Sequence, residues 1–132
     1  MAYFVDSSVI VAVLSGEEDG ETWAALIEAG SDKSTSPVAI YEATLALCRK
    51  FRISTEQAQS ILVEFLHRSG IAVVDIPATA YEGALSAHAQ YGKGTGSPAQ
   101  LNLGDCFSYA MAKLLGSNLL YKGDDFAHTD LA

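Results

Sequence analysis

The chain has 132 residues, of which 49% are hydrophobic and 18% are charged, and its formal net charge is −8 at pH 7. This length and composition predict one domain over residues 1–132 with a hydrophobic core, and they exclude an intrinsically disordered protein. The acidic balance excludes a protein that holds nucleic acid by bulk positive charge, but it is compatible with a nuclease that uses bound metal ions as its positive charge.

Two further features concern the compartment. No apolar run approaches the roughly 18 residues that a membrane span requires, and Asp6 interrupts the first apolar run. Cys48 and Cys106 lie far apart in apolar stretches, which is typical of free, buried thiols in a reducing compartment. We therefore expect a cytoplasmic protein that contacts no membrane.

Short apolar runs alternate with helical patterns along the chain. In chain order we expect a strand at 3–5, helices at 9–14 and 21–29, a strand at 33–36, helices at 37–51 and 55–69, a strand at 71–76, helices at 77–91 and 102–115, and a strand at 119–122. Ser7 or Ser8 is expected to cap the first helix, and Ser54 forms a capping box with Gln57.

Two patterns also predict which side chains are buried. The third helix carries apolar residues at helical spacing, namely Val38, Tyr41, Leu45 and Cys48. This spacing predicts its buried face, with Tyr41 in the core. The β-branched run at residues 71–76 predicts a buried strand.

The alternation of strands and helices predicts an α/β fold. The connections are long enough for parallel pairing, so we expect a small central parallel sheet with a layer of helices on each face. In such sheets the reactive site lies outside the carboxyl ends of the strands.

Carboxylates are placed at that edge. Asp6 closes the first strand, Asp105 lies in the first turn of the last helix, and Asp124 and Asp125 follow the last strand. Glu42 on the third helix can face the same edge. Each acid alone has an ordinary interpretation as a helix cap, a turn residue or a solvated side chain. Together they would repel one another, and a hard divalent cation such as Mg²⁺ or Mn²⁺ would remove that repulsion.

These residues belong to motifs that resemble PIN-domain ribonucleases, in particular the VapC toxins of bacterial toxin–antitoxin pairs. The motifs are Asp6-Ser7-Ser8 after a strand, Tyr41-Glu42 on a helix, Leu101-Asn102-Leu103-Gly104-Asp105-Cys106 at a helix start, and Gly123-Asp124-Asp125-Phe126 followed by Thr129-Asp130. The resemblance covers essentially the whole chain and implies a PIN-like α/β/α domain with endoribonuclease activity.

The resemblance also implies the site. Asp6, Glu42 and Asp105 would line an acidic pocket for Mg²⁺ or Mn²⁺, with Asp6 and Asp105 as the preferred direct ligands. The fourth acidic position is Asp124 or Asp125, and the local spacing leaves both open. We slightly prefer Asp124 as the catalytic residue, with Asp125 in support.

A small hydroxyl residue, Ser7 or Ser8, would help to order the pocket. Few cations are available to bind RNA, and the candidates are Arg49, Arg52, Lys93 and Lys122, each of which could equally be solvated surface. The expected reaction is metal-assisted hydrolysis of a phosphodiester bond by water, because no activated side-chain nucleophile is evident.

The resemblance implies partners as well. These are an RNA substrate, a VapB-type antitoxin whose C-terminal segment covers the pocket, and a second copy of the chain in a homodimer or larger toxin–antitoxin assembly. Operator DNA would be contacted only through the antitoxin. Apolar helix residues such as Tyr41, Leu45 and Phe65 could meet another chain or belong entirely to the core.

Two alternatives come from other functional classes. A receiver-like signalling module would use Asp75 as phosphoacceptor and Lys122 as its late lysine, but it usually has paired acids after its first strand. A haloacid-dehalogenase-like phosphatase would use Asp6, but here Ser8 stands where that family usually has a second aspartate.

Overall fold

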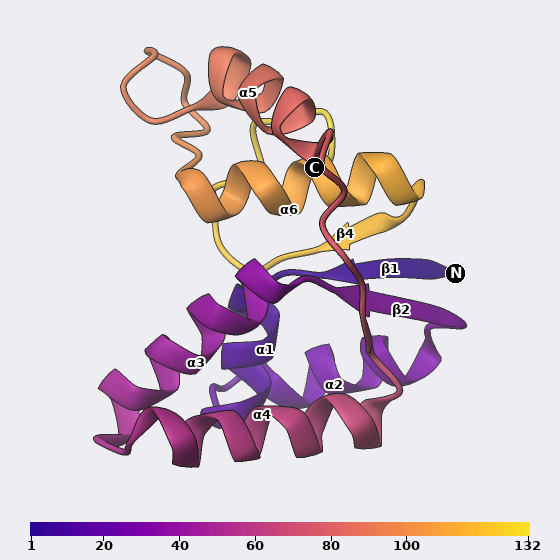
Figure 1. Ribbon diagram of the computed structural model, residues 1–132, viewed down its shortest axis with the longest axis vertical. Coiled ribbons are helices and arrows are strands. Elements are labelled where there is room, and N and C mark those ends of the chain that lie inside the picture. Colours follow the sequence, from indigo (N-terminus) through magenta and orange to yellow (C-terminus); the bar gives the residue numbers. More distant parts are fainter.

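A four-stranded sheet forms the centre of the computed structural model, which describes residues 1–132 (Figure 1). The strands are β1 (Ala2–Val5), β2 (Asp32–Thr35), β3 (Ala72–Val73) and β4 (Asn118–Leu120). Their order is β3-β2-β1-β4, and all three neighbouring pairs are parallel. The central strand β1 pairs Phe4 with Ser34 of β2 and with Leu119 of β4.

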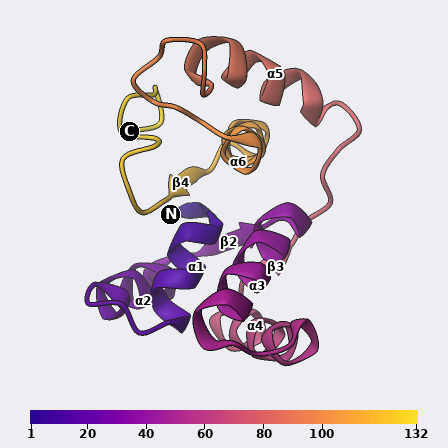
Figure 2. The ribbon, with the colours of Figure 1, turned by 90° about the vertical axis from the view of Figure 1, so that its left-hand side faces the viewer.

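Helices cover both faces of the sheet (Figure 2). They are α1 (Ser7–Leu14), α2 (Gly20–Ala29), α3 (Pro37–Phe51), α4 (Thr55–Ser69), α5 (Ala80–Tyr91) and α6 (Leu103–Leu115). Helices α5 and α6 lie on one side, and α1 to α4 lie on the other. The expected three-layer α/β fold is therefore confirmed.

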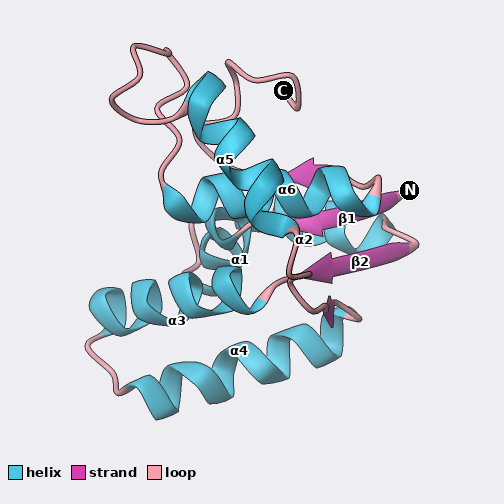
Figure 3. Ribbon diagram, turned by 45° about the horizontal axis from the view of Figure 1, so that its top comes forward, coloured by secondary structure: helices cyan, strands magenta, loops and turns pink.

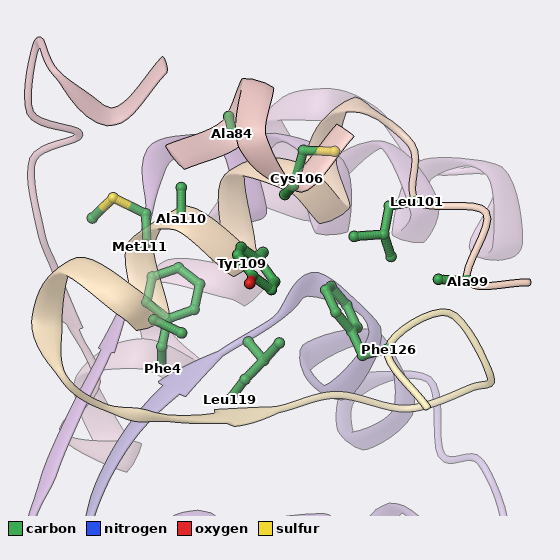
Figure 4. Packing of buried hydrophobic residues seen from close by; sticks show 12 residues of the cluster. Phe4, Ala84, Ala99, Leu101, Cys106, Tyr109, Ala110, Met111, Leu119 and Phe126 are labelled. Carbon is green, nitrogen blue, oxygen red and sulfur yellow. The ribbon is translucent and has the colours of Figure 1, made fainter. Parts of the chain in front are cut away.

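Side chains that alternate between the two faces of the sheet divide the hydrophobic core into two clusters. Phe4 of β1 and Leu119 of β4 are buried against α5 and α6, in a cluster that includes Met111 and Phe126 (Figure 4). The next residues along, Val5 and Leu120, belong to the cluster on the opposite face, with α1 to α4. This pattern follows from the two-residue repeat of a strand.

Local capping signals explain most helix boundaries. Ser36 caps α3, which begins at Pro37, and the capping box between Ser54 and Gln57 begins α4 as expected. At α1 the cap is Asp6, so the expectation that Ser7 or Ser8 caps this helix is wrong: these serines occupy its first turn. Pro77 lies in a turn before α5, where its carbonyl accepts a hydrogen bond from the Ala80 amide at 2.9 Å.

Two predictions of burial are wrong. The strand at residues 71–76 is reduced to Ala72–Val73, and both residues are exposed because β3 is an edge strand. On α3 the buried residues are Ala39, Ala43 and Leu47, whereas the side chain of Tyr41 is 65% exposed. Helix α3 carries two apolar stripes, and the stripe of smaller side chains faces the core.

The carboxyl ends of β1, β2 and β4 lie at the same edge of the sheet, as their arrowheads show in Figure 3. One residue separates β1 from α1, and one residue separates β2 from α3. Cys106 is buried, Cys48 is half-buried, and both are free thiols. None of the helices has the length and hydropathy of a membrane span.

Candidate active site

Asp6 is held at the end of β1 by hydroxyl and amide donors. Its side chain is 3% exposed. The Ser8 amide and hydroxyl both donate to Oδ2, at 3.1 Å and 2.6 Å, and the Ser108 hydroxyl donates to Oδ1 at 2.7 Å. The capping geometry of α1 and a serine from α6 therefore fix this carboxylate between them.

Glu42 reaches the same region from α3. The Ser7 hydroxyl donates to its Oε1 at 3.3 Å. On its other side lies the backbone of Gly104 in α6, and a Cβ at that position would stand closer than 3.0 Å to the carboxylate. Burial, followed by the negative charge of Asp6, raises the pKa of Glu42. Only a residue without a side chain at 104 allows Glu42 this position.

Asp105 belongs to the capping box of α6. Its Oδ2 accepts a hydrogen bond from the Asn102 amide at 3.0 Å, and the Asn102 side chain accepts one from the Asp105 amide at 2.9 Å. Burial raises the pKa of Asp105 to about 7, and the charges of Asp6, Asp125 and Glu42 add to this rise, against the opposing effect of the Asn102 amide. The four acids are therefore electrostatically coupled.

The two acids that follow β4, Asp124 and Asp125, differ in their effect on the site. Both are exposed, and of the two only Asp125 contributes, through its negative charge, to the raised pKa of Asp105. The carbonyl of Asp124 accepts a hydrogen bond from the Ala127 amide at 3.1 Å, in the turn that follows Gly123. The charge of Asp125 acts on Asp105, and this supports Asp125 for the fourth acidic position, in contrast to the slight preference for Asp124.

The acidic cluster has no cationic partner. None of the four ion pairs in the structure includes Asp6, Glu42, Asp105 or Asp125. The donors that hold these carboxylates are hydroxyl groups and backbone amides, which leave the negative charge uncompensated. An oxygen-only donor set with excess negative charge fits a hard divalent cation.

The carboxylates do not, however, form a finished cage. No group of three or more aspartate, glutamate, histidine or cysteine side chains stands ready to hold a metal ion. The charge and the oxygen donors of these side chains suit a divalent cation, but the structure does not present them as a preformed set of three ligands.

The candidate RNA-binding cations lie at different places. Arg49 and Arg52 are exposed at the end of α3, and Arg49 lies about 10 Å along the helix axis from Glu42 at 1.5 Å per residue. Lys122 forms ion pairs with Glu17 at 2.9 Å and Asp19 at 2.8 Å. Its charge is compensated, which argues against the suggested role in RNA binding.

Lys93 lines an apolar groove of about 440 Å³ between α5 and the start of α6. Tyr81, Leu85, Leu103 and Phe107 are among the other residues of this groove. The ion pairs of the structure leave Lys93 free.

Sequence reasoning missed two residues of the site. Ser108 is 102 positions from Asp6, so no local pattern links them. Its place three residues after Asp105, on the same helix face, was the available signal. Gly104 belongs to the motif at the start of α6, but the motif alone does not indicate its close approach to Glu42.

Comparison with known proteins assigns the chain to a family. The family model for the PIN domain matches residues 3–131. The chain is 42% identical to VapC ribonuclease R02377 of Rhizobium meliloti, over 97% of this chain and 98% of that protein. It is 40% identical to ribonuclease VapC30 of Mycobacterium tuberculosis, over 97% and 95% of the two chains.

Solved structures agree on the fold. VapC20 of Mycobacterium tuberculosis, described as a sarcin-ricin loop cleaving toxin, superposes with a TM-score of 0.72 at 18% identity, over 95% of this chain and 92% of that chain. A toxin–antitoxin complex from Klebsiella pneumoniae gives a TM-score of 0.69 at 18% identity, over 99% and 94%. These matches give no support to a receiver module or a haloacid-dehalogenase-like phosphatase. The chain belongs to the PIN domain family, and within it to the VapC ribonucleases.

Proposed function

We propose that the protein is a metal-dependent endoribonuclease toxin that hydrolyses phosphodiester bonds in RNA and is neutralised by a cognate antitoxin. The observation that carries this proposal is the coupled acidic cluster at the carboxyl edge of the sheet. Carboxylates from the end of β1, from α3, from α6 and from the segment after β4 influence one another there, and no cation neutralises them. The identity of 40% and 42% to two named VapC ribonucleases, over 97% of this chain, supports the same function.

Asp6 and Asp105 are the residues that would hold Mg²⁺ or Mn²⁺, with Glu42 and Asp125 beside them. The bound ion would lower the pKa of a water and neutralise charge on the scissile phosphate. Ser8 and Ser108 orient the Asp6 carboxylate, and Ser7 orients Glu42. Glu42 and Asp125 would accept hydrogen bonds from water at the site.

Attack by water, without a covalent intermediate on the protein, agrees with the nearby side chains. Burial and the charge of Asp105 raise the pKa of the Cys106 thiol, which therefore stays protonated and unreactive. The Ser8 hydroxyl donates to Asp6 and accepts from the Lys122 amide, so both roles of that hydroxyl are occupied. No side chain is activated as a nucleophile.

Lys93, with Arg49 and Arg52 farther away, is the candidate contact for RNA phosphates. With so few free cations, we expect weak binding to arbitrary RNA and selection of an unpaired, structured target. RNA as substrate and two free thiols fit a cytoplasmic location.

We further propose that exposed apolar side chains of the helices meet partner chains, namely a VapB-type antitoxin and a second copy of this chain. The large hydrophobic residues exposed by at least 44% include Tyr41, Ile61, Leu85 and Leu103. Operator DNA would be contacted only through the antitoxin. One of the structural neighbours is a toxin–antitoxin complex, which supports an antitoxin as the kind of partner.

The decisive test substitutes Asp6→Asn, which keeps the volume of the side chain and removes its charge. We expect loss of Mg²⁺- or Mn²⁺-dependent RNA cleavage with an unchanged circular dichroism spectrum. Asp75→Asn is the matched control, because Asp75 is an exposed acid and is not among the charges coupled to Asp105. Cleavage by the Asp6 variant at the wild-type rate would refute the proposal.

A further inference from the structure

We propose that Ser108 is a positioning residue that orients Asp6 for metal binding, an inference that rests on the proposed function. Ser108 is 2% exposed and lies inside α6. Its hydroxyl donates to Asp6 Oδ1 at 2.7 Å, across 102 residues of sequence. This hydrogen bond is the only one that Oδ1 receives in the structure.

The directions of the neighbouring hydrogen bonds make the role of Ser108 distinct from that of Ser8. The Lys122 amide donates to Ser8 Oγ at 3.0 Å, so the hydroxyl proton of Ser8 is directed to Asp6 Oδ2. The Ser8 amide donates to the same oxygen. Ser8 therefore holds Oδ2 from the first turn of α1, and Ser108 alone fixes the other oxygen and with it the plane of the carboxylate.

Helix α6 thereby controls both preferred metal ligands. Asp105 and Ser108 are three residues apart, so they lie on the same face of one rigid helix. The helix carries one ligand directly and orients the other through a hydroxyl group. The orientation of the Asp6 carboxylate relative to Asp105 then depends on α6 as well as on the first turn of α1.

The test compares Ser108→Ala with the wild type by calorimetric titration of Mn²⁺ and by RNA cleavage kinetics. Loss of a hydrogen bond to a ligating carboxylate typically weakens metal binding or activity about 10–100-fold, and we expect a weakening of Mn²⁺ affinity in this range. We also expect kcat to fall with little change in KM for RNA, because Ser108 is buried and has no route to the substrate.

Ser15→Ala is the matched control. It removes the hydroxyl of the residue that caps the C-terminal end of α1. This hydroxyl donates to the Val11 carbonyl at 2.6 Å and to Glu17 at 3.5 Å, and it makes no hydrogen bond to any acid of the cluster. Ser108→Thr retains the hydroxyl and should restore Mn²⁺ affinity. If the alanine variant does not fold, Ser108→Cys replaces the hydroxyl by a weaker donor of similar size and should give an intermediate affinity.

The outcomes separate this inference from the proposed function. Wild-type Mn²⁺ affinity in a folded Ser108→Ala variant, in a protein that cleaves RNA, would overturn the positioning role alone. Weaker Mn²⁺ binding by the variant, in a protein that cleaves no RNA, would support the positioning role and refute the nuclease. A change only in melting temperature would show that Ser108 is purely structural and would also overturn the inference.

Discussion

Substitution of Gly104 by alanine should inactivate the site without unfolding the protein. A Cβ at position 104 would lie within 3.0 Å of the Glu42 carboxylate, which real Cβ atoms essentially never do. The obstructing group is the end of a flexible side chain, so Glu42 moves and the helices stay in place. To reach ordinary contact at 3.4 Å, the carboxylate must retreat by on the order of 1 Å.

The magnitudes follow from this displacement. A misplacement of about 1 Å in a catalytic group can cost about 100-fold in rate, or roughly 2.7 kcal/mol in the activation free energy. Alanine instead of glycine stabilises a helix by about 0.5–1 kcal/mol, whereas loss of the hydrogen bond from Ser7 to Glu42 costs a similar amount. The net change in the free energy of unfolding is therefore close to zero.

The assay is a double-mutant cycle on kcat/KM for RNA cleavage with Gly104→Ala and Glu42→Gln. Both substitutions remove the Glu42 carboxylate from its position in the site. The kcat/KM of the double variant should therefore be no lower than that of the less active single variant. A loss of kcat/KM in the double variant equal to the product of the two single losses would refute the reasoning. Wild-type activity of the Gly104→Ala variant would also refute it. Thermal melting supplies the control, and a shift larger than about 4 °C would point to a packing defect instead.

Two further predictions concern protonation and RNA binding. In the metal-free protein burial raises the pKa of Asp105 from its ordinary value of 3.8 to about 7 in the folded state. Protonation of Asp105 therefore stabilises the folded state at low pH. This stability, at most about 4 kcal/mol, is lost as the pH rises from about 4 to about 7. Chemical denaturation should show Asp105→Asn as more stable than the wild type at pH 8 and nearly equal to it at pH 4; equal stability at both pH values would contradict the assignment. Lys93→Ala should raise KM for RNA. Lys122→Ala, which removes partly exposed ion pairs to Glu17 and Asp19, should change stability little and leave KM unchanged. Equal KM changes for the two lysine variants would show that the ion pairs of Lys122 do not withhold it from RNA.

The features that could be predicted from the sequence are those with a local cause. The capping box of Ser54 and Gln57 and the proline at the start of α3 act within a few residues, and the predicted starts of α4 and α3 are confirmed. The PIN family and the α/β fold are confirmed for a related reason, because the acids stand at strand ends and helix starts, where a parallel sheet gathers them. The individual site roles remain predictions.

The features that could not be predicted depend on packing between distant segments. Helix α3 carries two apolar stripes, and periodicity alone cannot show that the stripe with Ala43 and not the stripe with Tyr41 meets the core. The edge position of β3 depends on the order of strands in the sheet. The contact between Ser108 and Asp6, and the approach of Gly104 to Glu42, depend on where α6 crosses the sheet edge.

The central claim is that Asp6 and Asp105, from separate parts of the chain, bind one divalent ion together. The most direct measurement is anomalous X-ray diffraction from crystals of the protein soaked in Mn²⁺, collected at the manganese absorption edge. We expect an anomalous peak bonded to an oxygen atom of each of these two carboxylates and absent from crystals of the Asp6→Asn variant. A peak bonded to neither residue, or no peak at saturating Mn²⁺, would contradict the account.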